Sequence, residues 1–219
     1  MGSTELRILF VILPVLAWGL VSGFYLKELS ANSTLFWLHD FIGWILLPVA
    51  CLVFIFRYYN VRPHHYGLPS LRHQQIDARV FIKLGIAILV FLTFIPIEIM
   101  SLHIFPVSPL AFSYGDMMPK GASGKLAALY LAVTAAFVEE IFYRGLLKRV
   151  IIGNAETLVR YGMYVVFSAI LFGLNHWGQG LFKVVATTYL GIVAALIYLR
   201  FRNLWFLIGG HVFLNLLAA

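Results

Sequence analysis

Three groups of ionisable or amide side chains interrupt the apolar C-terminal half of the sequence. They are Glu139, Glu140 and Arg144 in FVEEIFYRG, Asn175 and His176 in FGLNHWG, and His211 and Asn215 in GGHVFLN. A charged side chain at the centre of a bilayer costs at least about 2.5–3.5 kcal/mol. Such residues are retained where protein partners or a water-filled cavity surround them, so these three stretches form the candidate functional site.

Four of these residues supply the groups needed to hydrolyse an amide bond. A carboxylate and an imidazole that face one pocket, here Glu139 and His176, can activate a water molecule. A second imidazole and an amide, His211 and Asn215, can donate hydrogen bonds to the oxyanion that forms when water attacks a carbonyl. The sequence therefore predicts peptide hydrolysis inside the membrane, with these four as the catalytic residues.

Helical spacing assigns supporting roles to neighbouring residues. Glu140 and Arg144 are four residues apart, which places them on one face of a helix and predicts an ion pair. Glu139 points about 100° away from Glu140 and is free for another partner. The same four-residue spacing recurs in two further pairs, His211 with Asn215 and Phe172 with His176.

The composition indicates a polytopic membrane protein. The chain has 219 residues, of which 62% are hydrophobic and 11% charged, and its mean hydropathy is +0.92. Soluble domains carry about 25% charged residues. The single cysteine, Cys51, excludes an intrachain disulfide and a cysteine-based zinc site. The formal charge of +7 comes from scattered basic residues, which indicates membrane topology signals rather than nucleic-acid binding.

Apolar runs long enough to cross a bilayer predict an all-α bundle of about seven transmembrane helices. The expected spans are residues 8–26, 35–57, 80–102, 124–148, 161–178, 181–200 and 203–218. The first run is too long for a cleaved signal peptide, and we expect it to be retained. With the N-terminus in the cytoplasm, twelve basic residues lie inside and four outside, which satisfies the positive-inside rule.

The depths of the polar residues along these spans agree only in part. The helical rise places Glu139 and His211 about 12–13 Å from the cytoplasmic ends of their helices. It places His176 about 22 Å from the start of the fifth span, nearer the outer face. Tilt, a longer fourth helix or a later start of the fifth would remove this mismatch.

Taken together, the three motifs resemble the CAAX protease and bacteriocin-processing (CPBP, or Abi) family of glutamic intramembrane proteases. That family carries EExxxR, FxxxH and HxxxN or HxxxD on successive helices. Here the matching stretches are EEIFYR at 139–144, FGLNH at 172–176 and HVFLN at 211–215. The resemblance covers roughly residues 120–219, which we expect to be the catalytic core of four spans. Residues 1–119 would add three N-terminal spans.

The resemblance implies roles for individual residues. Glu139 and His176 would activate the water, and His211 and Asn215 would form the oxyanion hole. Glu140, Arg144 and Phe172 would support them. We expect no cofactor, because the HExxH spacing of zinc proteases is absent and an asparagine is a poor zinc ligand. If a metal is bound, its ligands would be Glu139, His176 and His211.

Two other classes of function remain open. The chain could be a non-catalytic CPBP scaffold for binding or immunity, although a binder need not keep both histidines and Asn215. It could be a transporter that relays protons through Glu139 and Glu140, but it lacks internal repeats. The resemblance implies a membrane-borne peptide or protein as substrate, cut near its C-terminus. The expected location is a bacterial inner membrane, with lipid as a further partner.

Other polar residues in the spans have structural interpretations. Glu98 follows Pro96 near the outer end of the third span and is expected to be an interfacial carboxylate. His39 and Asp40 lie at the outer end of the second span, where the sequence identifies no partner for them.

Overall fold

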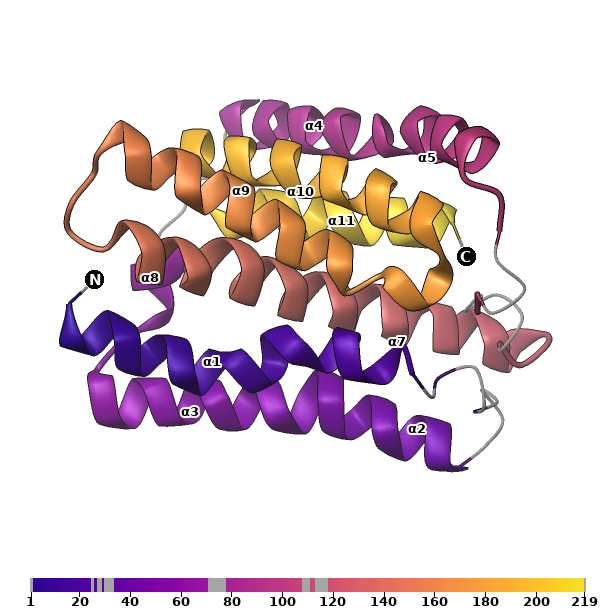
Figure 1. Ribbon diagram of the computed structural model, residues 1–219, viewed down its shortest axis with the longest axis horizontal. Coiled ribbons are helices and arrows are strands. Elements are labelled where there is room, and N and C mark those ends of the chain that lie inside the picture. Colours follow the sequence, from indigo (N-terminus) through magenta and orange to yellow (C-terminus); the bar gives the residue numbers. More distant parts are fainter. Residues whose placement is uncertain are drawn as a thin grey trace.

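The computed structural model describes residues 2–24, 26, 29, 34–70, 78–107, 111–112 and 118–218. The fold is all-helical, with 84% helix, and no strand occurs in these ranges. This confirms the predicted fold class. The long helices run alongside one another, and the N- and C-termini lie at opposite ends of the bundle (Figure 1).

The described ranges contain seven long helical segments, one for each predicted span. Four of them are single helices, and the other three are made of joined pieces. In chain order they are α1 (Ser3–Ser22); α2 (Thr34–Phe41), the π-helix η2 (Ile42–Leu46) and α3 (Leu47–Tyr59); α4 (Ala78–Leu92) and α5 (Phe94–Ile104); α7 (Ala122–Glu139), the π-helix η5 (Glu140–Leu146) and α8 (Leu147–Ile152); α9 (Leu158–Leu174); α10 (Leu181–Phe201); and α11 (Leu204–Leu217). Five of the seven segments are long and apolar enough to cross a bilayer, and α9 and α11 are shorter apolar helices. The protein is therefore an integral membrane protein.

The third segment is interrupted at Thr93, between α4 and α5. The Thr93 hydroxyl donates a hydrogen bond to the carbonyl of Val90 at 2.6 Å. Pro96 has no backbone N–H, so the carbonyl four residues before it loses its helical partner. The break therefore follows from a proline placed just after it in the sequence.

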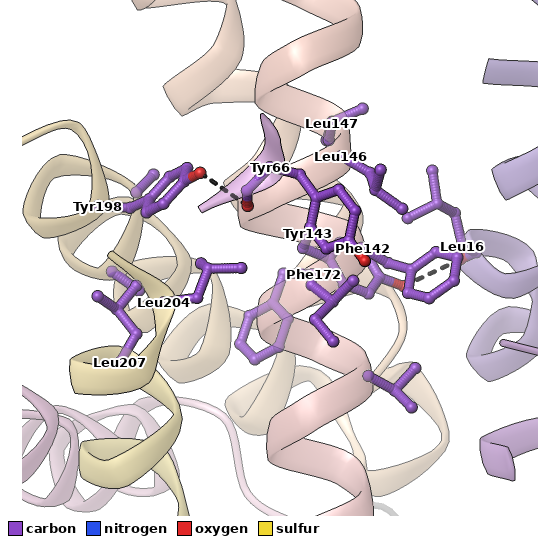
Figure 2. Packing of buried hydrophobic residues seen from close by; sticks show 14 of the residues in the cluster. Leu16, Tyr66, Phe142, Tyr143, Leu146, Leu147, Phe172, Tyr198, Leu204 and Leu207 are labelled. Carbon is purple, nitrogen blue, oxygen red and sulfur yellow. Dashed lines mark hydrogen bonds between the residues drawn. The ribbon is translucent and has the colours of Figure 1, made fainter. Parts of the chain in front are cut away.

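The segment formed by α7, η5 and α8 occupies the centre of the bundle. All seven residues of η5 are buried, and α1, α9 and α11 pack against it. The Tyr143 hydroxyl donates to the Leu16 carbonyl of α1 at 3.0 Å (Figure 2). The Ser168 hydroxyl of α9 donates to the Tyr143 carbonyl at 2.9 Å. The helix that carries the two glutamates is thus fixed from both sides.

Close packing of α9 against α10 depends on Gly191. A Cβ atom at this position would lie 2.7 Å from the Ala169 backbone Cα. We expect Gly191→Ala to lower stability by about 1–3 kcal/mol, because the two helices must move apart. Thermal unfolding of the purified protein in detergent measures this change.

Gly162 on α9 provides a matched control, because a Cβ there meets nothing within 4 Å. Gly162→Ala should leave the unfolding temperature unchanged or raise it slightly, since alanine favours the helix. Equal behaviour of the two variants would contradict the tight contact.

Candidate active site

A π-helical turn lies within the first motif. Glu139 is the last residue of α7, and η5 begins at Glu140. A π-helix bonds residue i to i+5 and is wider than an α-helix, and such turns are often found at functional sites. Sequence reasoning missed this turn and treated the motif as regular α-helix.

Glu140 and Arg144 form the predicted ion pair in the interior of the helical bundle. Arg144 Nε lies 3.4 Å from Glu140 Oε2, and both side chains are fully buried. The guanidinium carbon of Arg144 also lies 4.1 Å from the centre of the Phe172 ring on α9. Arg144 thus contacts both of the other residues that the sequence predicts to be supporting.

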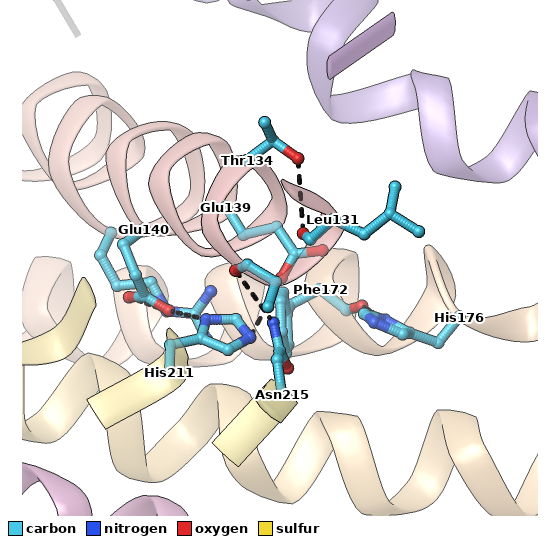
Figure 3. Close-up of polar contacts among 10 residues, drawn as sticks. Leu131, Thr134, Glu139, Glu140, Phe172, His176, His211 and Asn215 are labelled. Atoms are coloured by element: carbon cyan, nitrogen blue, oxygen red, sulfur yellow. Dashed lines mark hydrogen bonds and ion pairs between the residues drawn. The ribbon is translucent and has the colours of Figure 1, made fainter. Parts of the chain in front are cut away.

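His211 lies between the two glutamates. Its Nδ1 is 2.8 Å from Glu140 Oε1, and its Nε2 is 3.4 Å from Glu139 Oε2. The adjacent carboxylates thus contact the two nitrogens of one imidazole, which is only 3% exposed (Figure 3). Glu139 therefore has His211 as its partner, whereas the sequence had paired Glu139 with His176. Among the described residues, Glu139 and His176 make no direct hydrogen bond or ion pair.

His176 follows the end of a helix instead of lying within one. The fifth span was expected to continue to residue 178, but α9 ends at Leu174. His176 Nδ1 still lies 2.8 Å from the Phe172 carbonyl. A carbonyl only accepts, so Nδ1 carries the proton, and Nε2 of the neutral ring is left as an acceptor.

The helix lengths reduce the expected mismatch in depth on one side only. The fourth segment continues to Ile152, four residues beyond the predicted end at 148, as one of the expected explanations requires. By contrast, α9 begins at Leu158, earlier than the predicted 161 and not later. His176 and Glu139 nevertheless line the same cavity.

Asn215 lies one turn after His211 on α11. Its amide nitrogen is 3.4 Å from the Ala132 carbonyl of α7, a long hydrogen bond (Figure 3). The amide group also faces the cavity. A bond of this length leaves the side chain able to donate to a ligand instead.

The four predicted catalytic residues line one cavity of about 280 Å³. It is bounded by α1, α2, α7, α10 and α11 and by the turn after α9. Several water molecules fit into this volume. Carboxylate, imidazole and amide groups in one enclosed space can activate water and stabilise a developing oxyanion.

The alternative metal ligands make other contacts. Within the described parts of the chain, no three His, Cys, Asp or Glu side chains are grouped so that they could hold one ion. His211 lies between two carboxylates, and His176 Nδ1 bonds to a backbone carbonyl.

Comparison with known families finds a match in the C-terminal part of the chain. No curated protein and no solved structure matches the chain. Residues 122–217 match the family described as type II CAAX prenyl endopeptidase Rce1-like. The matched segment begins in α7, ends with α11 and contains the three polar motifs. This match confirms the resemblance to the CPBP family that the three motifs predict, over residues 122–217.

Proposed function

We propose that this protein is an endopeptidase that hydrolyses a peptide bond of a membrane-associated peptide or protein. The family that residues 122–217 match is one of intramembrane peptidases, which supports this proposal. The observation that carries the proposal is the shared cavity lined by Glu139, His176, His211 and Asn215. Three separate motifs contribute these residues, so a purely structural role for each does not account for their meeting in one cavity.

In the proposed first step, a water molecule lies between Glu139 and the unprotonated Nε2 of His176. His176 orients the water by accepting one hydrogen bond, and its bond to the Phe172 carbonyl fixes the ring. The water oxygen attacks the carbonyl carbon of the substrate while Glu139 accepts a proton from it. This step forms the C–O bond and leaves negative charge on the carbonyl oxygen.

Asn215 and His211 stabilise that oxyanion in the proposed second step. Asn215 donates its amide hydrogen, and His211 redirects Nε2–H from Glu139 to the oxyanion. The long 3.4 Å contact between His211 and Glu139 favours such a change of partner, whereas the 2.8 Å contact with Glu140 holds the ring. Protonated Glu139 then returns the proton to the leaving nitrogen as the C–N bond breaks.

The matched family supports a substrate class, and the location is proposed from the sequence alone. We infer that the substrate is cut near its C-terminus, as in CAAX-type, bacteriocin or sorting-signal processing. The proposed location is a bacterial inner membrane, where lipid surrounds the helices and no nucleic acid is bound. We expect catalysis without a metal.

Cleavage of membrane peptides by the detergent-purified protein tests the proposal. A panel of prenylated and unprenylated C-terminal peptides is incubated with and without a strong zinc chelator, and products are identified by mass spectrometry. Chelator-resistant cleavage supports the proposal. Loss of cleavage that zinc restores would overturn the metal-free mechanism. If a folded protein binds peptides of the panel but cleaves none, the scaffold alternative is favoured.

His176→Ala is expected to reduce kcat about 10²–10⁴-fold with little change in KM, because the water loses its orienting acceptor. Steady-state kinetics on a cleaved peptide measures both constants. His103→Ala is the matched control, since His103 Nδ1 makes the same bond to a carbonyl four residues earlier, at 2.7 Å, but is exposed and outside the cavity. Equal losses in both variants would contradict the role of His176.

A further inference from the structure

A buried carboxylate that the proposed reaction does not use lines the same cavity. Asp40 of α2 is 4% exposed, and its Oδ2 atom has no hydrogen-bond partner. The Tyr130 hydroxyl of α7 faces the carboxylate as a hydrogen-bond donor. A buried polar atom without a partner is rare and costs free energy, so an unmet oxygen at a cavity wall indicates a ligand.

The ion pairs found within the described ranges do not involve Asp40. Arg144, Lys183 and Arg202 pair with Glu140, Glu98 and Glu156. The ring of the neighbouring His39 is stacked on Trp18 at 4.6 Å, and its Nε2 lies 3.1 Å from the Ser22 hydroxyl. A buried carboxylate is favourable only when a cation or several donors compensate it.

The walls near Asp40 suit a cationic group. Trp44, four residues later in the same segment, lines the cavity, as does Ser22 of α1. Indole rings attract ammonium and guanidinium groups, and a carboxylate forms strong charge-assisted hydrogen bonds with them. An aromatic ring, a hydroxyl and an unpaired carboxylate together match the head of a lysine or arginine side chain.

We propose that Asp40 and Trp44 form a specificity subsite that receives a basic side chain of the peptide substrate. This inference rests on the proposed function, because the subsite shares its cavity with Glu139 and His176. A peptide that places its scissile bond at Glu139 then carries a lysine or arginine at one fixed position near that bond. Asp40 is a binding residue and takes no part in the proton transfers.

Peptide binding tests the subsite independently of cleavage. Glu139→Gln protein is titrated with fluorescent, N-acetylated peptides that carry one lysine at successive positions, each matched by a norleucine peptide. At one position, lysine should lower Kd about tenfold or more relative to norleucine. In Asp40→Asn, the ratio of the norleucine Kd to the lysine Kd at that position should fall close to one. Glu156→Gln, a control at an exposed carboxylate, should keep the ratio of the parent.

Charge reversal and cleavage complete the test. The Asp40→Lys variant should bind a peptide with glutamate at that position more tightly than the matched norleucine peptide. A lysine preference that persists in Asp40→Asn, or its absence at every position, would overturn the subsite. Cleavage of the same peptides by protein with Glu139 intact separates the two proposals. Preferential binding without cleavage refutes the proposed function alone, and cleavage without a lysine preference refutes the subsite alone.

Discussion

Replacing Glu139 with glutamine is expected to lower kcat for peptide cleavage about 10³-fold or more. General acid–base catalysis typically contributes about 10²–10⁴-fold to the rate. The amide has nearly the same shape as the carboxylate and can still bond to His211 Nε2, so the fold should persist. It cannot accept the proton of the attacking water. Single-turnover cleavage assays measure the loss, and thermal unfolding verifies that the variant is folded.

The control for this experiment is Glu156→Gln. Glu156 is 49% exposed and pairs with Arg202 at 3.4 Å, and it does not line the cavity. This variant should cleave at the rate of the parent protein. If Glu139→Gln retained more than a tenth of the parental rate, the proton of the water would have to go to another group, and the proposed first step would be wrong.

Replacing Arg144 with leucine is expected to destabilise the protein by about 3–5 kcal/mol, the usual cost of removing one partner of a buried pair. The substitution leaves Glu140 fully buried without its guanidinium. It also removes the contact between the guanidinium and the Phe172 ring. Thermal unfolding in detergent measures the change, and cleavage should fall as well, because Glu140 positions His211.

Two further variants define the origin of that effect. Arg202→Gln removes an arginine whose pair is exposed, with side chains 59% and 49% accessible, so the unfolding temperature should change little. The double variant Glu140→Gln/Arg144→Leu should recover part of the stability, because no lone buried charge remains. If Arg144→Leu were as stable as the parent protein, the buried pair would have no role in holding the bundle together.

Much of this architecture can be predicted because polar residues are rare in a membrane bundle. Each apolar run is a helix by physical necessity, since the backbone must satisfy its hydrogen bonds internally. A glutamate or histidine within such a run must then face the interior. Spacing of four residues sufficed to pair Glu140 with Arg144. Glu139, His176, His211 and Asn215 line one cavity, and their catalytic roles stay a prediction.

The remaining features depend on distances between helices that no local pattern specifies. The position of His211 between two carboxylates requires the exact placement of α11 against α7. Asp40 had no visible partner in the sequence, because Tyr130 and the cavity wall belong to another helix. Glu98 was expected at the interface, and it pairs with Lys183 of α10. The π-helical turn has no signal in the residue types of the motif.

That π-helical turn lets the helix hold one residue more than a regular α-helix would. An α-helix advances about 100° per residue, so an extra residue in regular α-helix would rotate everything after it by about 100°. A π-helical turn takes up the extra residue within one turn, so that α7 before it and α8 after it keep a common register. Deleting one residue between Glu140 and Leu146 should therefore convert the segment into continuous α-helix and leave the packing of α8 against α1 and α9 in place. A deletion in the regular helix α7, which has no such turn to absorb it, would instead rotate the two parts of the helix by about 100° relative to each other.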